Sequence, residues 1–297
     1  MSEILNCAIK DGFRVSYEDR VKTATSSKGN QIKWRRSDGL WAKADDMGHE
    51  GLAEQTASFL LSHSNFDEYA EYAVCKIYED DAVYTGCVSV DFLSVGESLL
   101  TLGRLLESIG LEPYEDMEKM PASQRLVYLI ENTEKITGMN GFGKWLGMLL
   151  EFDALIANED RHLHNIAVVK KSDGTYKPMP VFDNGAGFLS DTHRDYPLET
   201  GMNLGRMISR VKSKPLVTDF DKQLAAVSEV VGLSLKFNCA PDIIRVSSNE
   251  YSSQVVSRVQ GIIPFYIRSW STRYRPTIRR RKSRPYSGPI PPPHLPR

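Results

Sequence analysis

Two short polar strings, joined by a predicted β-hairpin, constrain the fold of this chain more than any other feature of its sequence. The first is Asp160-Arg161-His162-Leu163-His164-Asn165 and the second is Phe182-Asp183-Asn184-Gly185. Between them, a β-branched run, an Asp173-Gly174 turn signal and an apolar run through 180–182 predict two antiparallel strands. Because the return strand would carry Asp183 back beside Asn165, both strings are expected to line one cavity.

The residue types in these strings suit phosphoryl transfer. Asp160 could orient an attacking hydroxyl, while Asn165 and Asp183 offer the hard oxygen ligands that Mg²⁺ prefers. Mg²⁺ usually keeps several waters, so these two side chains and the nucleotide phosphates would suffice to hold it. Either string alone is ordinary turn chemistry, but the two in this order predict an ATP-dependent kinase.

The same strings resemble a known family. Asp160-Arg161-His162-x-x-Asn165 followed by Phe182-Asp183-Asn184-Gly185 is similar to the catalytic and metal-binding segments of the HipA-like serine/threonine kinases, including their small stand-alone bacterial members. Phosphatidylinositol kinases share a similar first string. Upstream, 39–43 and 50–54 resemble the family's nucleotide-lysine strand and following helix, and 84–93 resembles its strand entering the interlobe hinge. The resemblance spans roughly residues 25 to 265, at the level of motifs.

The resemblance implies a bilobal, protein-kinase-like α+β fold. A strand-rich nucleotide-binding lobe would cover residues 1–93 and a mainly helical catalytic lobe residues 94–267, with ATP and Mg²⁺ in the cleft between them. A chain of 297 residues that is 41% hydrophobic can bury cores of this size. The implied reaction moves the γ-phosphate to Ser or Thr of a protein substrate, and to the protein itself. Asp160 would be the acceptor-orienting residue or general base, and Asn165 and Asp183 would bind Mg²⁺.

Lys43 and Glu54 are the expected phosphate cation and its partner. Lys43 lies in a short strand-like stretch, where a lysine is a suitable point charge for nucleotide phosphates. The segment 49–62 has an amphipathic helical pattern that could turn Glu54 inward to hold this lysine, with Glu50 as a competitor. Most lysines are simply solvated, so the pairing is a specific prediction.

The remaining nucleotide contacts are expected from a polar loop and from the hinge. The segment 23–31 could place backbone N–H groups over phosphates, although it has one glycine and neither a G-x-G-x-x-G nor a Walker A pattern. The resemblance implies a Ser/Thr-rich loop there, with Ser26 and Ser27 as hypothetical autophosphorylation sites. The candidate cofactor contacts are Ser26, Ser27, Lys28 and Gly29 in the loop, Ser89, Val90, Asp91 and Phe92 through hinge backbone groups, and His162 in the first string.

Helical periodicity predicts what positions the first string. One helix is expected from Pro121 to Thr137, ended by Gly138. A second follows, in which Trp145, Leu149, Phe152 and Ile156 recur at four- and three-residue steps and form a core stripe that stops just before the string. Further helices are expected over 220–231 and 249–263.

Cysteine usage and hydropathy favour a cytoplasmic protein. The four cysteines, Cys7, Cys75, Cys87 and Cys239, show no C-x-x-C pair and no ligand spacing, which favours free thiols in a reducing compartment. The chain shows no secretory apolar segment and no run of 18 apolar residues, so no transmembrane segment is expected. Export as an effector, without a classical signal, is an alternative.

The C-terminal tail, residues 268–297, has a composition of its own. It carries nine Arg and Lys residues and no acidic residue, although the whole chain has a formal net charge of −1. Its many prolines predict disorder. Such a tail could bind nucleic acid or an anionic membrane in a salt-sensitive manner, so a pure binding module is a competing class of function.

The residues of the two strings also fit functions outside protein phosphorylation. A lipid or small-molecule kinase would use the same Asp160, Asn165 and Asp183 with a different acceptor pocket, and a pseudokinase would bind nucleotide without turnover. A zinc site from His162, His164 and His193 is less favoured, because these histidines lack helical spacing and a nearby Cys partner. The resemblance also implies a toxin, effector or regulatory role, with an antitoxin or regulatory partner.

Overall fold

The computed structural model describes residues 4–5, 9–21, 31–199, 203–238, 245–246 and 248–273, and side chains as far as residue 264. The expected phosphate-loop residues Ser26, Ser27, Lys28 and Gly29 lie outside these ranges, as does the tail from Tyr274 onward. Residues 268–273, the first part of the segment expected to be disordered, continue the last helix.

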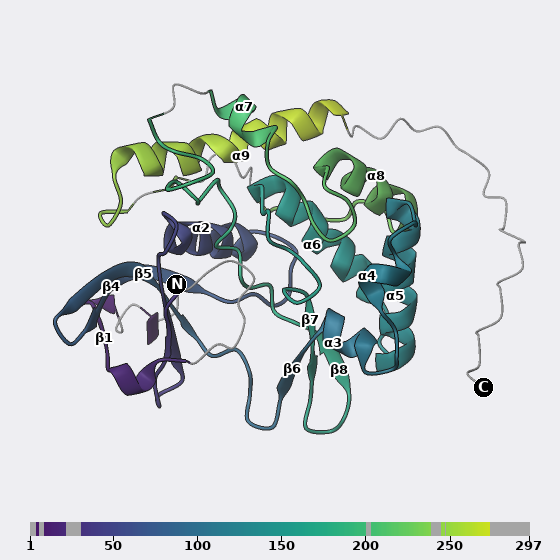
Figure 1. Ribbon diagram of the computed structural model, residues 1–297, viewed down its shortest axis with the longest axis horizontal. Coiled ribbons are helices and arrows are strands. Elements are labelled where there is room, and N and C mark those ends of the chain that lie inside the picture. The colour runs from purple at the N-terminus through teal and green to yellow at the C-terminus, as the bar shows by residue number, and fades with distance from the viewer. Residues whose placement is uncertain are drawn as a thin grey trace, which may run out of the picture.

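A five-stranded sheet forms the strand-rich part of the molecule (Figure 1). Its order is β1-β4-β5-β3-β2, in which β1 runs parallel to β4 and the other neighbours are antiparallel. The strands are β1 (Phe13–Val15), β2 (Lys33–Arg35), β3 (Leu40–Ala44), β4 (Tyr72–Glu79) and β5 (Ala82–Val90), with a 3-10 turn, η1 (Tyr17–Asp19), after β1. Helix α2 (Glu50–Ser62) joins β3 to β4 and packs against β4 and β5.

Strand β3 shows how alternation places a functional side chain. Leu40, Ala42 and Ala44 are buried on one face, in a small core shared with Phe13 and Trp34. Successive side chains of a strand point to opposite faces, so Lys43 points to the other face, toward α2. The sheet therefore buries its own core on one side and presents a lysine on the other.

The rest of the chain is mainly helical, with a small antiparallel sheet β6-β7-β8 beside it. The three strands are β6 (Ser98–Thr101), β7 (Ala167–Lys170) and β8 (Tyr176–Pro178). The helices are α3 (Leu102–Glu107), α4 (Pro113–Asp116), α5 (Ala122–Thr137), α6 (Phe142–Ile156), α7 (Leu204–Ile208), α8 (Phe220–Val230) and α9 (Ser253–Arg273). The expected start of α9 near residue 249 is therefore a few residues early.

The predicted hairpin exists, but its strands are shorter than expected. Strand β7 begins at Ala167, after Asn165, and β8 ends at Pro178, before the apolar run through 180–182. The carbonyl oxygens of Asn165 and Phe182 both accept hydrogen bonds from Arg161. A side chain therefore binds the groups that a longer strand ladder would have used.

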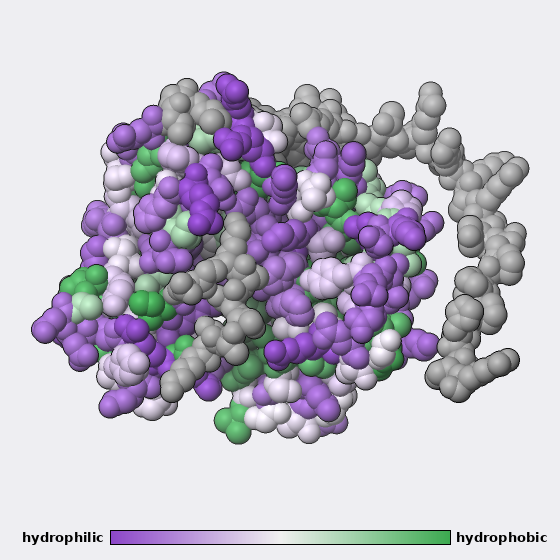
Figure 2. Space-filling view, in the orientation of Figure 1, coloured by the Kyte–Doolittle hydropathy of each residue, from purple (hydrophilic) through white to green (hydrophobic). Residues whose placement is uncertain are grey.

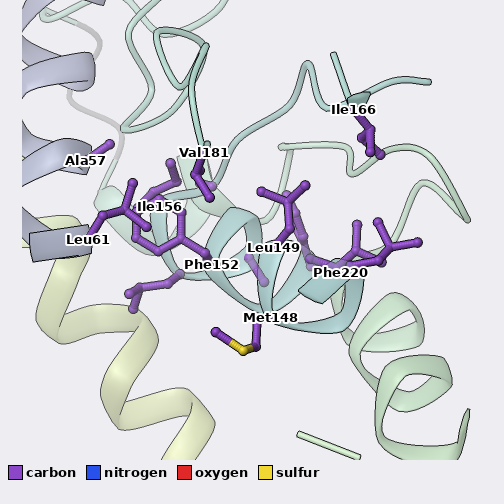
Figure 3. Close-up of a cluster of buried hydrophobic side chains, with 14 of the residues drawn as sticks. Ala57, Leu61, Met148, Leu149, Phe152, Ile156, Ile166, Val181 and Phe220 are labelled. Atoms are coloured by element: carbon purple, nitrogen blue, oxygen red, sulfur yellow. The ribbon is translucent and has the colours of Figure 1, made fainter. Parts of the chain in front are cut away.

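Helix α6 runs through the larger hydrophobic core (Figure 3). Leu149, Phe152 and Ile156 are fully buried, as their spacing predicts, whereas Trp145 is only partly buried and stacks on Phe142. Side chains of α2, such as Leu61, belong to the same cluster. Because α2 shares its core with the helical part, a boundary at residue 93 stays a prediction; that position falls between β5 and β6.

The surface carries no sign of a membrane-spanning element in the part of the chain that is described. None of its helices is both long and apolar enough to cross a bilayer. Hydrophilic residues cover most of the face shown in Figure 2, with hydrophobic residues scattered among them. Cys75 and Cys87 are buried free thiols, while Cys7 and Cys239 lie outside the described ranges.

Candidate active site

Lys43, Glu54 and Asp183 form a three-membered charge cluster between the two parts of the molecule. The Nζ atom of Lys43 lies 2.9 Å from Oε1 of Glu54 and 3.0 Å from Oδ1 of Asp183. The second oxygen of Glu54 accepts the backbone N–H of Asn184 at 2.8 Å. One carboxylate of α2 therefore fixes both the lysine of β3 and the peptide that follows Asp183. The Lys43–Glu54 pair predicted from the sequence is formed.

Glu50, the competitor for Lys43, has a different role. Its carboxylate accepts the backbone N–H groups of Met47 at 2.7 Å and Gly48 at 3.0 Å. These groups precede the first turn of α2, where backbone donors lack helical partners and favour a negative charge. Glu50 thus stabilises the start of the helix that positions Glu54.

The charge cluster holds Lys43 and Asp183 in their ionised states. Burial lowers the pKa of Lys43, but Asp183 and Glu54 outweigh that effect and raise the pKa well above its ordinary value. Burial likewise favours the neutral form of Asp183, but Lys43 and Lys33 outweigh it and hold the pKa of this carboxyl well below its usual range. Asp183 is therefore a carboxylate at neutral pH, as a metal ligand must be.

Asp183, rather than Gly185 or Gly187 after it, makes the sharp turn at the end of this string. Its φ angle is 59°, in the left-handed region that Asp tolerates better than most residues. The two glycines do not have positive φ angles. Gly187 instead permits close packing, because a Cβ atom there would lie 3.0 Å from Ile156 and 3.1 Å from the carbonyl oxygen of Asn184.

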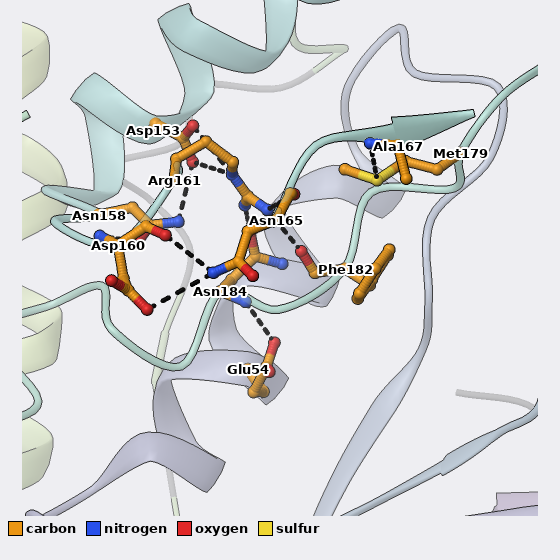
Figure 4. Close-up of polar contacts among 10 residues, drawn as sticks. All are labelled: Glu54, Asp153, Asn158, Asp160, Arg161, Asn165, Ala167, Met179, Phe182 and Asn184. Carbon is orange, nitrogen blue, oxygen red and sulfur yellow. Dashed lines mark hydrogen bonds and ion pairs between the residues drawn. The ribbon is translucent and has the colours of Figure 1, made fainter. Parts of the chain in front are cut away.

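Arg161 is the buried centre that joins the two strings (Figure 4). Its Nε atom donates to both oxygens of Asp153 on α6, at 3.1 and 3.0 Å. Its Nη1 atom donates to the carbonyl oxygens of Asn165 and Phe182, and its Nη2 atom to the side-chain oxygen of Asn184 at 2.7 Å. Asp153 anchors the guanidinium to the core helix, and the guanidinium holds both strings in one arrangement.

Asp160 lies in the first string with two supports and a cation. Its backbone N–H donates to Oδ1 of Asn158 at 3.1 Å, and its carbonyl oxygen accepts from Nδ2 of Asn165 at 2.8 Å. Its carboxylate lies 3.0 Å from Nζ of Lys214. Lys214 comes from the connection between α7 and α8, and no motif in the sequence marks it.

His162 shapes the loop rather than reaching outward. Its Nδ1 atom accepts the backbone N–H of His164 at 3.1 Å, and burial lowers its pKa despite the nearby Asp160 carboxylate. Among the described residues, no group of three or more His, Cys, Asp and Glu side chains could hold a metal ion, so the zinc interpretation has no support. A site built from one carboxylate and one amide is not a group of this kind.

A cleft collects most of the predicted catalytic and metal-binding residues. Asp160, Asn165, Asp183 and Glu54 all line it, and so does Lys33 of β2, which sequence reasoning missed. The full lining is Gln31, Lys33, Asp46, Met47, Glu50, Glu54, Asp160, Asn165, Asp183, Gly185, Ala186, Ser190 and Asp191. Gln31 closes the segment expected to cover phosphates.

The expected hinge residues do not line this cleft. Ser89 is buried, Val90 is 36% exposed, and the Asp91 carboxylate lies 2.8 Å from Arg35. The ring of Phe92 packs 5.1 Å from that of Phe182, next to Asp183. These residues lie at the end of β5, and their contact with adenine stays a prediction.

Comparisons with known proteins identify the fold. No protein-family model and no curated protein matches the chain. Among solved structures, the chain is similar to a Helicobacter pylori proinflammatory kinase, CtkA, with a TM-score of 0.59 and 14% sequence identity. The match covers 87% of this chain and 95% of that one. At this low identity the similarity shows the fold alone, and it confirms the predicted bilobal, kinase-like α+β class.

Proposed function

We propose that this protein is an ATP-dependent phosphotransferase of the HipA-like serine/threonine kinase type. The observation that carries the proposal is a cleft lined by Glu54, Asp160, Asn165 and Asp183, in which Glu54 and Asp183 also hold Lys43 in an ion pair. Phosphoryl transfer asks little covalent chemistry of a protein and depends on positioning and charge. A rigid cluster of this kind in a kinase-like fold is well suited to that task.

The side chains present fit a bound Mg²⁺ and nucleotide. Asp183 is ionised and 30% exposed, so its carboxylate is accessible from the cleft. The amide nitrogen of Asn165 is engaged by the Asp160 carbonyl, which leaves its side-chain oxygen as the metal-binding atom. When bound, Mg²⁺ would neutralise charge on the phosphate oxygens. No cage of several carboxylates is needed for such a site.

Each remaining residue has a role that follows from its contacts. Lys43 is shared between Glu54 and Asp183, so Asp183 can release the lysine to bind a metal while Glu54 retains it. Asp160 would accept a hydrogen bond from the acceptor hydroxyl and take its proton. Lys214, beside Asp160, supplies positive charge where the acceptor and the transferred group would meet.

The acceptor class follows from the motif resemblance. The motif resemblance to serine/threonine kinases favours a protein Ser or Thr, and the structural neighbour is itself described as a kinase. A lipid or small-molecule acceptor would require the same cluster. We therefore propose a protein hydroxyl acceptor and test the nucleotide site separately from it.

Thermal unfolding with nucleotide tests the site directly. Wild type should be stabilised by ATP with Mg²⁺, and less so when EDTA removes the metal; saturation at 100 times the Kd contributes about 2.7 kcal/mol. Asp183→Asn should lose the metal-dependent part of the shift. Asp81→Asn, which changes an exposed carboxylate in the β4–β5 turn, is the matched control and should behave as wild type. A folded wild type that ATP and Mg²⁺ do not stabilise would overturn the proposal.

A further inference from the structure

Lys33 and Lys43 are placed side by side on one face of the sheet. Lys33 of β2 pairs directly with Lys43 of β3 in the antiparallel register. Residues opposite each other in such a pair point to the same face, with Cβ atoms about 4.5–5.5 Å apart, and two like charges there destabilise the sheet. The repulsion between these two lysines therefore lowers the stability of the sheet, and the fold does not require a lysine at both positions.

The two lysines differ in what neutralises them. The ammonium of Lys43 contacts Glu54, Asp183 and the hydroxyl of Tyr72. Within the described ranges, no hydrogen bond or ion pair joins the ammonium of Lys33 to another residue. Burial and the neighbouring Lys43 lower the pKa of Lys33, with Asp183 and Glu54 acting in the opposite direction. Glu54 and Asp183 thus form their hydrogen bonds with Lys43 and not with Lys33.

Lys33 is also directed toward the cleft rather than toward bulk solvent. It is partly buried and lines the same cleft as Asp160, Asn165 and Asp183. The next residue, Trp34, is fully buried on the opposite face, which fixes the alternation of β2. A solvated strand lysine would be at an exposed position, as Lys170 is at the end of β7.

We propose that Lys33 is a second phosphate-binding residue, and that Lys33 and Lys43 together form a two-lysine site for the polyphosphate chain of a nucleotide. The inference rests on the proposed function and adds a residue to it. Lys43 is fixed by Glu54, whereas Lys33 has its charge available for a ligand. An anion between the two ammonium groups removes their repulsion, so the pair should select nucleotides by the number of their phosphates.

The test compares Lys33→Met with Lys170→Met, a matched strand lysine at an exposed position. The affinities of ATP with Mg²⁺, ADP with Mg²⁺ and adenosine are measured by calorimetry, and thermal unfolding is recorded without ligand. Lys33→Met should weaken ATP binding about tenfold or more, weaken ADP binding less, and leave adenosine binding unchanged. It should also raise the melting temperature of the ligand-free protein, because the like-charge pair is gone.

Each outcome separates this inference from the proposed function. If folded wild type binds no ATP, the proposed function fails. If wild type binds ATP and Lys33→Met binds it equally well, only the role of Lys33 fails. An equal loss for adenosine and ATP would mark a structural defect and also overturn the inference. Lys33→Arg keeps the charge and should restore ATP affinity, which guards against misfolding of the methionine variant.

Discussion

Replacement of Arg161 by Met should be among the most destabilising single changes in this protein. The guanidinium is fully buried, and it is the counter-ion of Asp153, which is also fully buried. In Arg161→Met the carboxylate would remain in the core without a cation. The hydrogen bonds to the carbonyl oxygens of Asn165 and Phe182 and to the side chain of Asn184 would also be lost.

The size of the loss follows from this burial. Removing one partner of a buried ion pair costs about 3–5 kcal/mol, because the remaining charge is left uncompensated. A typical folded protein has about 5–15 kcal/mol of stability in total. Arg161→Met should therefore lose about a fifth of its stability or more. With an m-value of about 2–3 kcal/mol/M, its urea midpoint should fall by about 1–2.5 M.

Urea unfolding at pH 7 and 25 °C, followed by circular dichroism, measures the effect. The informative control is the double variant Arg161→Met with Asp153→Asn, which removes the stranded charge. The double variant should be more stable than Arg161→Met alone, even though it differs from wild type at two positions instead of one. Arg161→Lys keeps a cation but cannot reach all four acceptors, so it should lie between wild type and Arg161→Met.

Two results would refute this reasoning. One is an Arg161→Met protein within about 1 kcal/mol of wild type at an unchanged m-value, since a buried unpaired carboxylate cannot be that inexpensive. The other is a double variant no more stable than Arg161→Met, which would mean that Asp153 is not the charge responsible.

Three further predictions concern His49, Asp45 and Lys214. Burial lowers the pKa of His49 to about 4, whereas the unfolded imidazole titrates near 6.5. The free energy of unfolding should therefore fall by up to about 3 kcal/mol as the pH drops from 6.5 to 4. His49→Gln should remove this pH dependence, measured by urea unfolding at pH 7 and 4.5. Burial raises the pKa of Asp45 to about 7. The stability that its neutral form contributes is therefore fully present below about pH 4 and is lost as the pH rises through 7. Asp45→Asn should have a higher melting temperature than wild type at pH 8 but not at pH 4. Lys214 is 42% exposed, so Lys214→Met should change stability by less than about 1 kcal/mol while lowering kcat for phosphoryl transfer, and an unchanged kcat would remove Lys214 from the site.

The helices that position the site could be predicted because their signals are local. The end of α5 is set by Gly138, whose φ angle of 68° is the left-handed cap that glycine provides most easily. The core stripe of α6 and the inward turn of α2 follow from helical periodicity, and that turn brings Glu54 to Lys43 as expected. Local propensity and burial agree in these segments.

The features that sequence reasoning missed depend on contacts between distant segments. Arg161 belongs to the first string, yet it binds the Phe182 carbonyl and the Asn184 side chain across the hairpin. Lys214 contacts Asp160 from a connection that contains no recognisable motif. Lys33 can be recognised as a site residue only from its strand pairing with Lys43. Periodicity within one segment carries no information about which distant residue completes a charge cluster.

The shortened hairpin and the turn at Asp183 share one physical cause. The interior of the site satisfies backbone groups with side chains instead of strand partners: Arg161 binds two carbonyl oxygens and Glu54 binds one N–H. A prediction from strand propensity expects these backbone groups to form hydrogen bonds with a neighbouring strand. Where a buried charged side chain forms these hydrogen bonds instead, the strand pairing ends early and Asp183 can adopt its left-handed conformation.

Transfer of labelled γ-phosphate from ATP with Mg²⁺ tests the central claim most directly. Wild type is compared with Asp160→Ala and Asp183→Ala, each shown to be folded by circular dichroism, using a generic protein acceptor, lipid vesicles and the protein itself as acceptors. We predict incorporation into protein by wild type that disappears in both variants. Label transferred only to lipid would correct the acceptor class, whereas undiminished transfer by the folded variants, or none by a folded wild type, would contradict the assignment of this cleft as a phosphotransfer site.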